Sequence, residues 1–228
     1  MGTKRDLYEF IDYIRDELNI KSTDLGIDMI RHCQSDPTIN LIWGNMQTKG
    51  FCGTIFFGNK IDTIVLNKNR SKFEQNFDFT HETVHKFKHR RLGKIACGCL
   101  TSCQNSFIEW EANEGSAELL VPYRKLLPLI REQLPDSPSC MEIVHLKKRL
   151  ADQFQVSDAV IHYRLESLKY EIFQYLDWDR PLEKLEILSA TQQRNRGIIV
   201  PSLNDIENEK FSEEFQAHIR SKNNKIIV

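Results

Sequence analysis

The segment His81-Glu82-Thr83-Val84-His85 places two imidazoles and a carboxylate at a spacing that suits metal chemistry. Histidines four residues apart lie one turn apart on the same helix face, so both rings can reach one ion. Glu82 is rotated about a third of a turn away, where it can contact a water on that ion. Because zinc lowers the pKa of bound water to ~7, a nearby carboxylate can take its proton. The spacing therefore predicts a zinc site with Glu82 as its general base.

Such a short motif also occurs by chance, and the alternative is a solvated helix that happens to carry two histidines. Three features of the surrounding sequence favour the metal site. The motif lies within a helical pattern of apolar residues, and a predicted pair of strands precedes it. Those strands would offer an edge for an extended peptide. A glutamate-rich segment follows the motif at a workable distance.

A catalytic zinc ion usually has three protein ligands and one open position. A third histidine in an extended HExxHxxGxxH motif is excluded, because Lys88 and Arg91 occupy the positions of the glycine and the histidine. His89 lies one turn beyond the motif, but three histidines on consecutive turns span ~12 Å, too far to share one ion. We therefore expect His89 to be a surface residue. The glutamates of the downstream helix remain, and both Glu109 and Glu111 are possible ligands.

HETVH followed by IEWEANEGSAELLVP at residues 108–122 resembles the ImmA/IrrE-type metallopeptidases, which are gluzincin-like enzymes. The second motif of that family reads approximately E-x-x-A-N-x-x-A-x-x-L-L-x-P. It is matched here by Glu109, Ala112, Asn113, Ser116 or Ala117, Leu119, Leu120 and Pro122. The resemblance covers roughly residues 50–170. It departs from the family at Gly115, where many members carry Phe, and this departure concerns local packing.

The resemblance has consequences for the site and for the substrate. It implies that Glu109 is the third ligand beside His81 and His85, and that Asn113 supports the site or packs one turn along. It implies hydrolysis of a peptide bond, with zinc, or alternatively manganese, as the metal. Many members act on phage or mobile-element repressors or on regulators of a DNA-damage response. We therefore expect a helix-turn-helix transcriptional repressor, encoded nearby, as the protein substrate.

Two other patterns have ordinary structural interpretations that we favour. Cys97, Cys99 and Cys103 lack the second CxxC of a structural zinc site, so they are interpreted as buried or loop thiols. Residues 150–165 have the form of a helix-turn-helix, which raises the alternative of a non-proteolytic regulator that binds DNA or a repressor. Residues 147–169 carry five Lys or Arg against three Asp or Glu, which is weak for phosphate binding. Packing is favoured over DNA contact.

The elements that must position the site follow from hydrophobic periodicity. Helices are predicted at 4–18, 22–33, 71–92, 107–121, 123–133, 141–154 and 157–176, and strands at 38–43, 53–57 and 61–66, with another possible at 197–200 before a charged tail. Gly58 and Asn59 predict a tight hairpin between the second and third strands. The pattern predicts an α+β fold with a small antiparallel sheet, and the resemblance implies that this fold is zincin-like. We expect a metallopeptidase domain at 1–135 and a C-terminal helical region at 136–228.

Composition limits the possible binding partners and cellular locations of the protein. The net charge of −1 in 228 residues gives no global argument for binding nucleic acid or an anionic membrane. No stretch approaches the ~20 apolar residues that cross a bilayer. The first 18 residues lack the apolar core of a signal peptide. A cytoplasmic location is therefore expected, with the six cysteines reduced.

Overall fold

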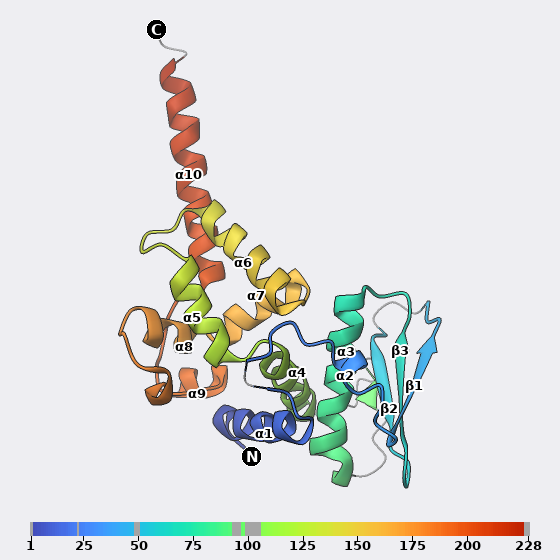
Figure 1. Cartoon of the computed structure of the whole chain (residues 1–228). Helices are drawn as coiled ribbons and strands as arrows, with labels where there is room; N and C mark the ends of the chain where they lie inside the picture. Colours follow the sequence, from blue (N-terminus) through green and yellow to red (C-terminus); the bar gives the residue numbers. More distant parts are fainter. Residues whose placement is uncertain (1, 22, 48–50, 93–96, 99–105, 226–228) are drawn as a thin grey trace. The chain divides into compact units, whose positions relative to one another are not determined.

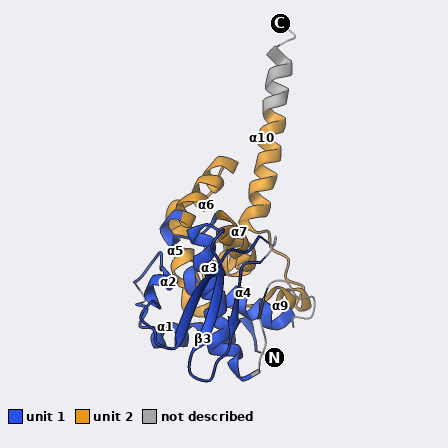
Figure 2. Cartoon of the chain, turned by 90° about the vertical axis from the view of Figure 1, so that its right-hand side faces the viewer, with its two compact units in different colours: residues 1–122, 152–157 blue, residues 123–151, 158–228 orange. Residues whose placement is uncertain are grey.

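The computed structural model describes residues 2–21, 23–47, 51–92, 97–98 and 106–225 (Figure 1). The chain divides into two compact units (Figure 2). Unit 1 comprises Met1–Pro122 with Asp152–Ser157, and unit 2 comprises Tyr123–Ala151 with Asp158–Val228. Both motifs that carry the predicted chemistry lie in unit 1.

Unit 1 contains a four-stranded sheet and the helices that pack beside it. Its elements are α1 (Lys4–Glu17), α2 (Met29–His32), β1 (Ile39–Gly44), β2 (Gly53–Phe56), β3 (Asp62–Asn67), α3 (Lys72–Val84), the π-helix η1 (His85–His89), the 3-10 helix η2 (Arg90–Leu92), β4 (Cys97–Gly98) and α4 (Ser106–Leu120). The predicted strands agree with β1, β2 and β3 to within one residue at each end. The second predicted helix is reduced to the single turn of α2.

The sheet is mixed, so the prediction of an antiparallel sheet was wrong. The strand order is β1-β3-β2-β4, with β1 parallel to β3 and β2 antiparallel to both β3 and β4. The central position of β3 follows from its side chains, since Ile64 and Leu66 are fully buried whereas β1 exposes Ile42 and Trp43. The inner strands β3 and β2 are thus more buried than the edge strand β1, and the strand order is not that of a simple meander.

The connection between β2 and β3 is longer than the predicted two-residue hairpin. The strands pair antiparallel as expected, but residues 57–61 separate them. Gly58 is required within this turn, because a Cβ atom there would lie 2.0 Å from the carbonyl oxygen of Ile61. Arg90 of η2 fixes the turn by donating to the Gly58 carbonyl at 2.7 Å and by pairing with Asp62. The 3-10 helix η2 therefore holds the turn between β2 and β3 in place.

Helix α3 lies between the sheet and α4, and α1 packs against α4 (Figure 1). Ser71 and Glu74 begin α3 with reciprocal capping hydrogen bonds. Its second half is buried on all sides, so the hydroxyls of Thr80 and Thr83 donate to carbonyls one turn earlier in the helix. A helix this deeply buried is rigid, which suits a metal site.

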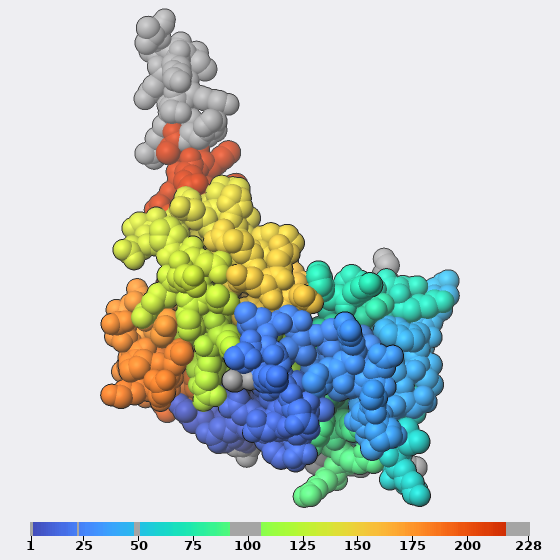
Figure 3. All heavy atoms as spheres, in the orientation of Figure 1, coloured from blue at the N-terminus to red at the C-terminus, as the bar shows by residue number. Residues whose placement is uncertain are grey.

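The N-terminal segment that includes Ile27 and Met29 covers the middle of α3, as the space-filling view shows (Figure 3). Asn76 of α3 holds this segment in place. Its Oδ1 accepts from the Met29 amide at 2.7 Å, and its Nδ2 donates to the Ile27 carbonyl at 2.8 Å. One side of the helix that carries His81 and His85 is thereby covered.

Unit 2 is helical. Its elements are α5 (Tyr123–Gln133), most of α6 (Cys140–Phe154), α7 (Asp158–Ser167), α8 (Lys169–Leu176), η3 (Leu182–Lys184), α9 (Ala190–Asn195) and α10 (Leu203–Lys225). The single helix predicted at 157–176 is divided at Leu168. Residues 197–200 form no strand, and the predicted charged tail is the helix α10. No helix in the described part of the chain is both long and apolar enough to span a membrane.

Candidate metal centre

Helix α3 brings His81 and His85 together on consecutive turns. Their ring centroids are 4.7 Å apart, and their Nε2 atoms are 3.0 Å apart. Both side chains are buried, and His85 has no exposed surface. The four-residue spacing read from the sequence therefore produces the expected pair of imidazoles on one helix face.

Glu109, in the first turn of α4, faces this pair. Its Oε2 lies 3.4 Å from His81 Nε2, and its Oε1 lies 3.6 Å from His85 Nε2. Among the described residues, His81, His85 and Glu109 form a group whose potential ligand atoms lie within 4.8 Å of one another. Of the two glutamates that the residue pattern left open, Glu109 is the one that reaches both histidines.

The donor set fits a tetrahedral zinc ion. Ligand atoms at 2.0–2.1 Å from such an ion are separated by ~3.3 Å. The three measured separations are 3.0, 3.4 and 3.6 Å, close to that value. Two imidazoles and one carboxylate also leave a fourth position open, which is the composition of a catalytic zinc site rather than a structural one.

Each histidine has a partner on the ring nitrogen that faces away from the group. His81 Nδ1 lies 3.0 Å from Asn113 Oδ1, one turn beyond Glu109 on α4. His85 Nδ1 lies 2.9 Å from Nδ1 of His89. Burial, together with the neighbouring His81 and His89, lowers the pKa of His85 to about 2. The His85 ring is therefore neutral at neutral pH, which is the form that binds a metal.

Glu82 follows His81 in the sequence and is also buried. Its Oε1 lies 3.6 Å from the position that a Cβ atom would take on Gly53, the first residue of β2. The carboxylate of the predicted general base is therefore held between α3 and the sheet. A side chain at position 53 would reduce the space beside it.

Helices α3 and α4 approach closely because α4 carries small residues at their contact. Ala112 and Ser116 are fully buried. A Cβ atom on Gly115 would lie 3.0 Å from Ile11 Cδ1 and 3.3 Å from Val84 Cγ1. Ile11 and Val84 therefore fill the space that a larger residue at position 115 would need. This packing accounts for the departure from the family pattern at Gly115.

The prediction that His89 is a surface residue was wrong. His89 is only 2% exposed, and its Nε2 lies 3.1 Å from Oε2 of Glu111. Burial lowers its pKa, an effect that the contact with Glu111 opposes. The sequence placed His89 on the surface and left Glu111 as a possible metal ligand, and neither expectation anticipated the contact between them. The recurring four-residue spacing of His81, His85 and His89 indicated that His89 shares their helix face. Whether His89 is buried depended on where α4 lies.

The structure does not describe the cysteine cluster that the sequence analysis singled out. Cys99 and Cys103 lie outside the described residues, as does the side chain of Cys97. Within the described part of the chain, Cys33 and Cys140 are free thiols.

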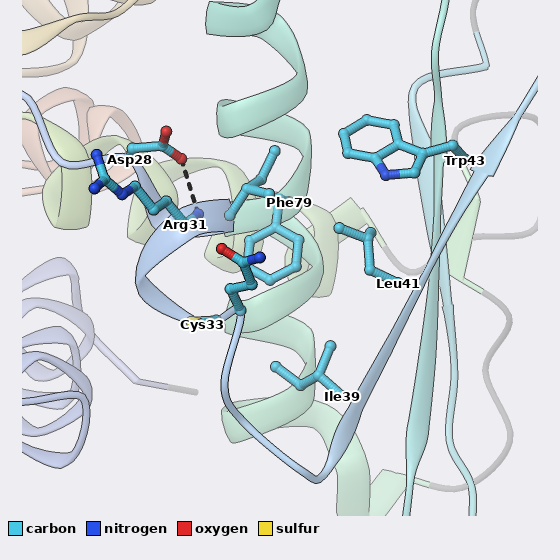
Figure 4. Close-up of a pocket in the computed structure, with 9 residues that line it drawn as sticks. Asp28, Arg31, Cys33, Ile39, Leu41, Trp43 and Phe79 are labelled. Atoms are coloured by element: carbon cyan, nitrogen blue, oxygen red, sulfur yellow. Dashed lines mark hydrogen bonds between the residues drawn. The ribbon is translucent and has the colours of Figure 1, made fainter.

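A pocket of about 350 Å³ lies between α2 and β1, beside Phe79 of α3 (Figure 4). Its lining includes none of the residues of the metal group. Cys33 lines it, and burial together with the nearby Asp36 raises the pKa of the thiol to about 11. The thiol is therefore protonated at neutral pH and is a poor nucleophile.

The metal group lies within a region of the chain that matches a known protein family. Residues 38–166 match the family model Peptidase_M78, described as the IrrE N-terminal-like domain. The match covers more than half of the chain and includes the sheet, the segment from His81 to His85, and Glu109. A search of curated proteins found no match.

Proposed function

This chain belongs to the Peptidase_M78 family, and on that premise we propose that it is a zinc-dependent endopeptidase that hydrolyses a peptide bond in a protein substrate. One observation carries the proposal. His81, His85 and Glu109 converge from α3 and α4 with separations that suit a single ion with an open position. Manganese is the alternative metal.

Different residues of the chain would bind the metal and transfer the proton during hydrolysis. A bound zinc ion would supply Lewis acidity, polarising the scissile carbonyl and making water acidic. His81 and His85 would bind through Nε2, with Glu109 completing the set. The Glu82 carboxylate takes a proton from the attacking water and returns it to the leaving nitrogen. Its burial beside Gly53 holds that carboxylate in a fixed place.

A substitution at Glu82 tests the assignment of the base. Glu82→Gln keeps the size of the side chain but removes the proton acceptor, so cleavage should fall by roughly 10²- to 10⁴-fold. Zinc content, measured by elemental analysis, should stay at the wild-type level. Glu132→Gln makes the same change at an exposed position on α5 and should leave cleavage unchanged. An active Glu82→Gln variant would refute the role of Glu82.

The substrate we propose is a helix-turn-helix transcriptional repressor, and the resemblance to ImmA/IrrE-type peptidases supports it. The direct test is co-expression of this chain with the repressor encoded beside it, followed by mass spectrometry of the repressor fragments. We expect a single cut that disappears with Glu82→Gln. If the repressor stayed intact under all inducing conditions while the wild-type enzyme was loaded with zinc, the proposal of this substrate would be refuted.

The competing function is a non-proteolytic regulator that binds DNA or a repressor. Helices α6 and α7 follow one another along the chain, with Gln155 at a positive φ of 52° between them. However, Arg164 is the sole Lys or Arg of α7, and it is 1% exposed. The exposed residues of α7 include Asp158 and Glu166, which repel phosphate. Tight DNA binding at physiological salt, unchanged in Glu82→Gln, would favour the regulator.

A further inference from the structure

A chain of buried polar atoms extends from the metal group into α4. It begins at His85, whose Nε2 faces His81 and Glu109 and whose Nδ1 lies 2.9 Å from His89 Nδ1. It continues from His89 Nε2 to Glu111 Oε2 at 3.1 Å. Both histidines are almost fully buried. The chain thus connects a metal ligand on α3 to a carboxylate that is not itself a ligand.

The proton positions along this chain follow from its last member. An ionised carboxylate only accepts hydrogen bonds, so His89 Nε2 must carry the proton and donate it to Glu111. A neutral imidazole has a single N–H, so His89 Nδ1 is then an acceptor. The contact between the two Nδ1 atoms requires one donor, which must be His85. The lone pair of His85 is therefore left on Nε2, the nitrogen that faces the metal group.

Lys88 holds the far end of the chain in place. Its Nζ lies 3.3 Å from Oε1 of Glu111, the oxygen that His89 does not use. The same ammonium lies 4.7 Å from the centre of the Phe10 ring on α1. Lys88 and His89 of η1 therefore each contact one oxygen of Glu111, and this carboxylate is oriented toward His89.

The backbone changes where this chain begins. Helix α3 ends at Val84, and residues from His85 to His89 form the π-helix η1. Short π-helical turns are rare and often occur at functional sites. The His85 and His89 ring centroids are 4.9 Å apart, with their planes at 55°. The step from His85 to His89 thus brings two ring nitrogens into contact and leaves the second ring facing α4.

We propose that His89 and Glu111 are positioning residues that fix the tautomer and the ring orientation of His85. The proposal rests on the metallopeptidase function, since it concerns a ligand of the proposed zinc ion. His89 is not a fourth ligand, because its two nitrogens contact His85 and Glu111. Glu111 acts on the metal site through His89, which explains why this segment carries a glutamate at position 111 as well as at position 109.

The first test measures zinc affinity by competition with a chromophoric chelator. Loss of a partner that orients a ligand typically lowers metal affinity 10- to 100-fold. We expect that loss in His89→Leu, which removes both ring nitrogens from the chain. His89→Gln retains an acceptor for His85 and a donor for Glu111, so it should bind zinc within a few-fold of wild type. His145→Leu, at an exposed histidine of α6, is the matched control and should not change the affinity.

The second test reads the tautomers directly. Two-bond ¹H–¹⁵N spectra of the zinc-loaded protein should show His85 protonated at Nδ1 and His89 protonated at Nε2. Glu111→Gln keeps the size of the side chain but can donate as well as accept, so His89 should lose its single tautomer and zinc affinity should fall. This variant decides the question if His89→Leu does not fold.

The outcomes separate this inference from the function on which it rests. A wild-type protein that binds no metal overturns the metallopeptidase proposal and this inference with it. A wild-type protein that binds one zinc ion, with unchanged affinity and unchanged tautomers in both His89→Leu and Glu111→Gln, overturns the positioning role alone. Reduced affinity in those variants, with rescue by His89→Gln, supports it.

Discussion

At the scale of single residues, the site depends on which ring nitrogen each histidine leaves free. His81 and His85 both direct Nε2 toward Glu109. Their Nδ1 atoms lie beside Asn113 and His89, so each ring is held from the opposite side. Such partners fix the orientation of a metal ligand before the metal arrives. The arrangement needs a neutral ring at His85, and burial provides it.

The low pKa of His85 predicts how the metal-free protein responds to acid. The unfolded chain takes up a proton at this ring near the ordinary pKa of 6.5, whereas the folded chain does so only at about 2. Between these values the unfolded state binds more protons. The free energy of unfolding should therefore fall as the pH is lowered below 6.5, by up to ~1.4 kcal/mol per pH unit. Above 6.5 this residue adds no pH dependence.

Thermal melts in EDTA between pH 5 and pH 8 measure this effect. The melting temperature should fall on the acid side, and the fall should be smaller in His85→Gln. His145→Leu removes an exposed histidine on α6 and should keep the wild-type slope. Equal slopes in wild type and His85→Gln would show that His85 is protonated alike in both states.

At the scale of elements, the site is a product of how closely α3 and α4 approach. Ala112, Gly115 and Ser116 present little side chain at the contact, and Val84 and Ile11 pack onto Gly115. Since α3 supplies two ligands and α4 the third, their separation sets the distance from Glu109 to the histidines. Packing and ligand geometry are therefore coupled through the same few residues.

Enlarging Gly115 tests that coupling. Gly115→Leu would place a branched side chain against Ile11 and Val84, so the free energy of unfolding should fall by about 1–3 kcal/mol. Zinc affinity should fall with it, because α4 must move away from α3. Gly115→Ala adds one methyl group and gains helix propensity of about 1 kcal/mol, so its net effect should be small. Urea denaturation gives both values, and a Gly115→Leu variant as stable as wild type would contradict the tight contact.

At the scale of the whole molecule, metal binding and folding should be linked. The three proposed ligands come from segments of the sequence that only the folded chain brings together, so the unfolded chain has no such site. A ligand that binds the folded state alone stabilises it by ~2.7 kcal/mol when present at a hundred times its dissociation constant.

Zinc should therefore raise the melting temperature of the wild-type protein in a concentration-dependent manner. Glu109→Ala removes a ligand and should lose most of the shift at the same zinc concentration. Glu132→Ala, an exposed glutamate on α5, should keep it. Differential scanning fluorimetry over a zinc titration makes the comparison. A shift that persists in Glu109→Ala would mean that zinc binds elsewhere.

The sequence by itself determined the features that depend on local spacing. His81 and His85 share a helix face because they are four residues apart, and neighbouring Glu82 is rotated away from them. The ends of α5, α6 and the first three strands follow periodicity and turn residues, which are also local signals. The family motif added Glu109, which spacing alone did not separate from Glu111.

Tertiary structure decided the features that depend on contacts between distant segments. The position of β3 between β1 and β2, with β1 parallel to it, depends on pairing between strands, and alternation along a strand does not show that. The burial of His89 required α4 to lie across η1 and bring Glu111 to it. Regular helical spacing also gave no sign of the π-helical turn. Residues 22 or more positions apart in the chain met only because burying apolar surface brought their helices together.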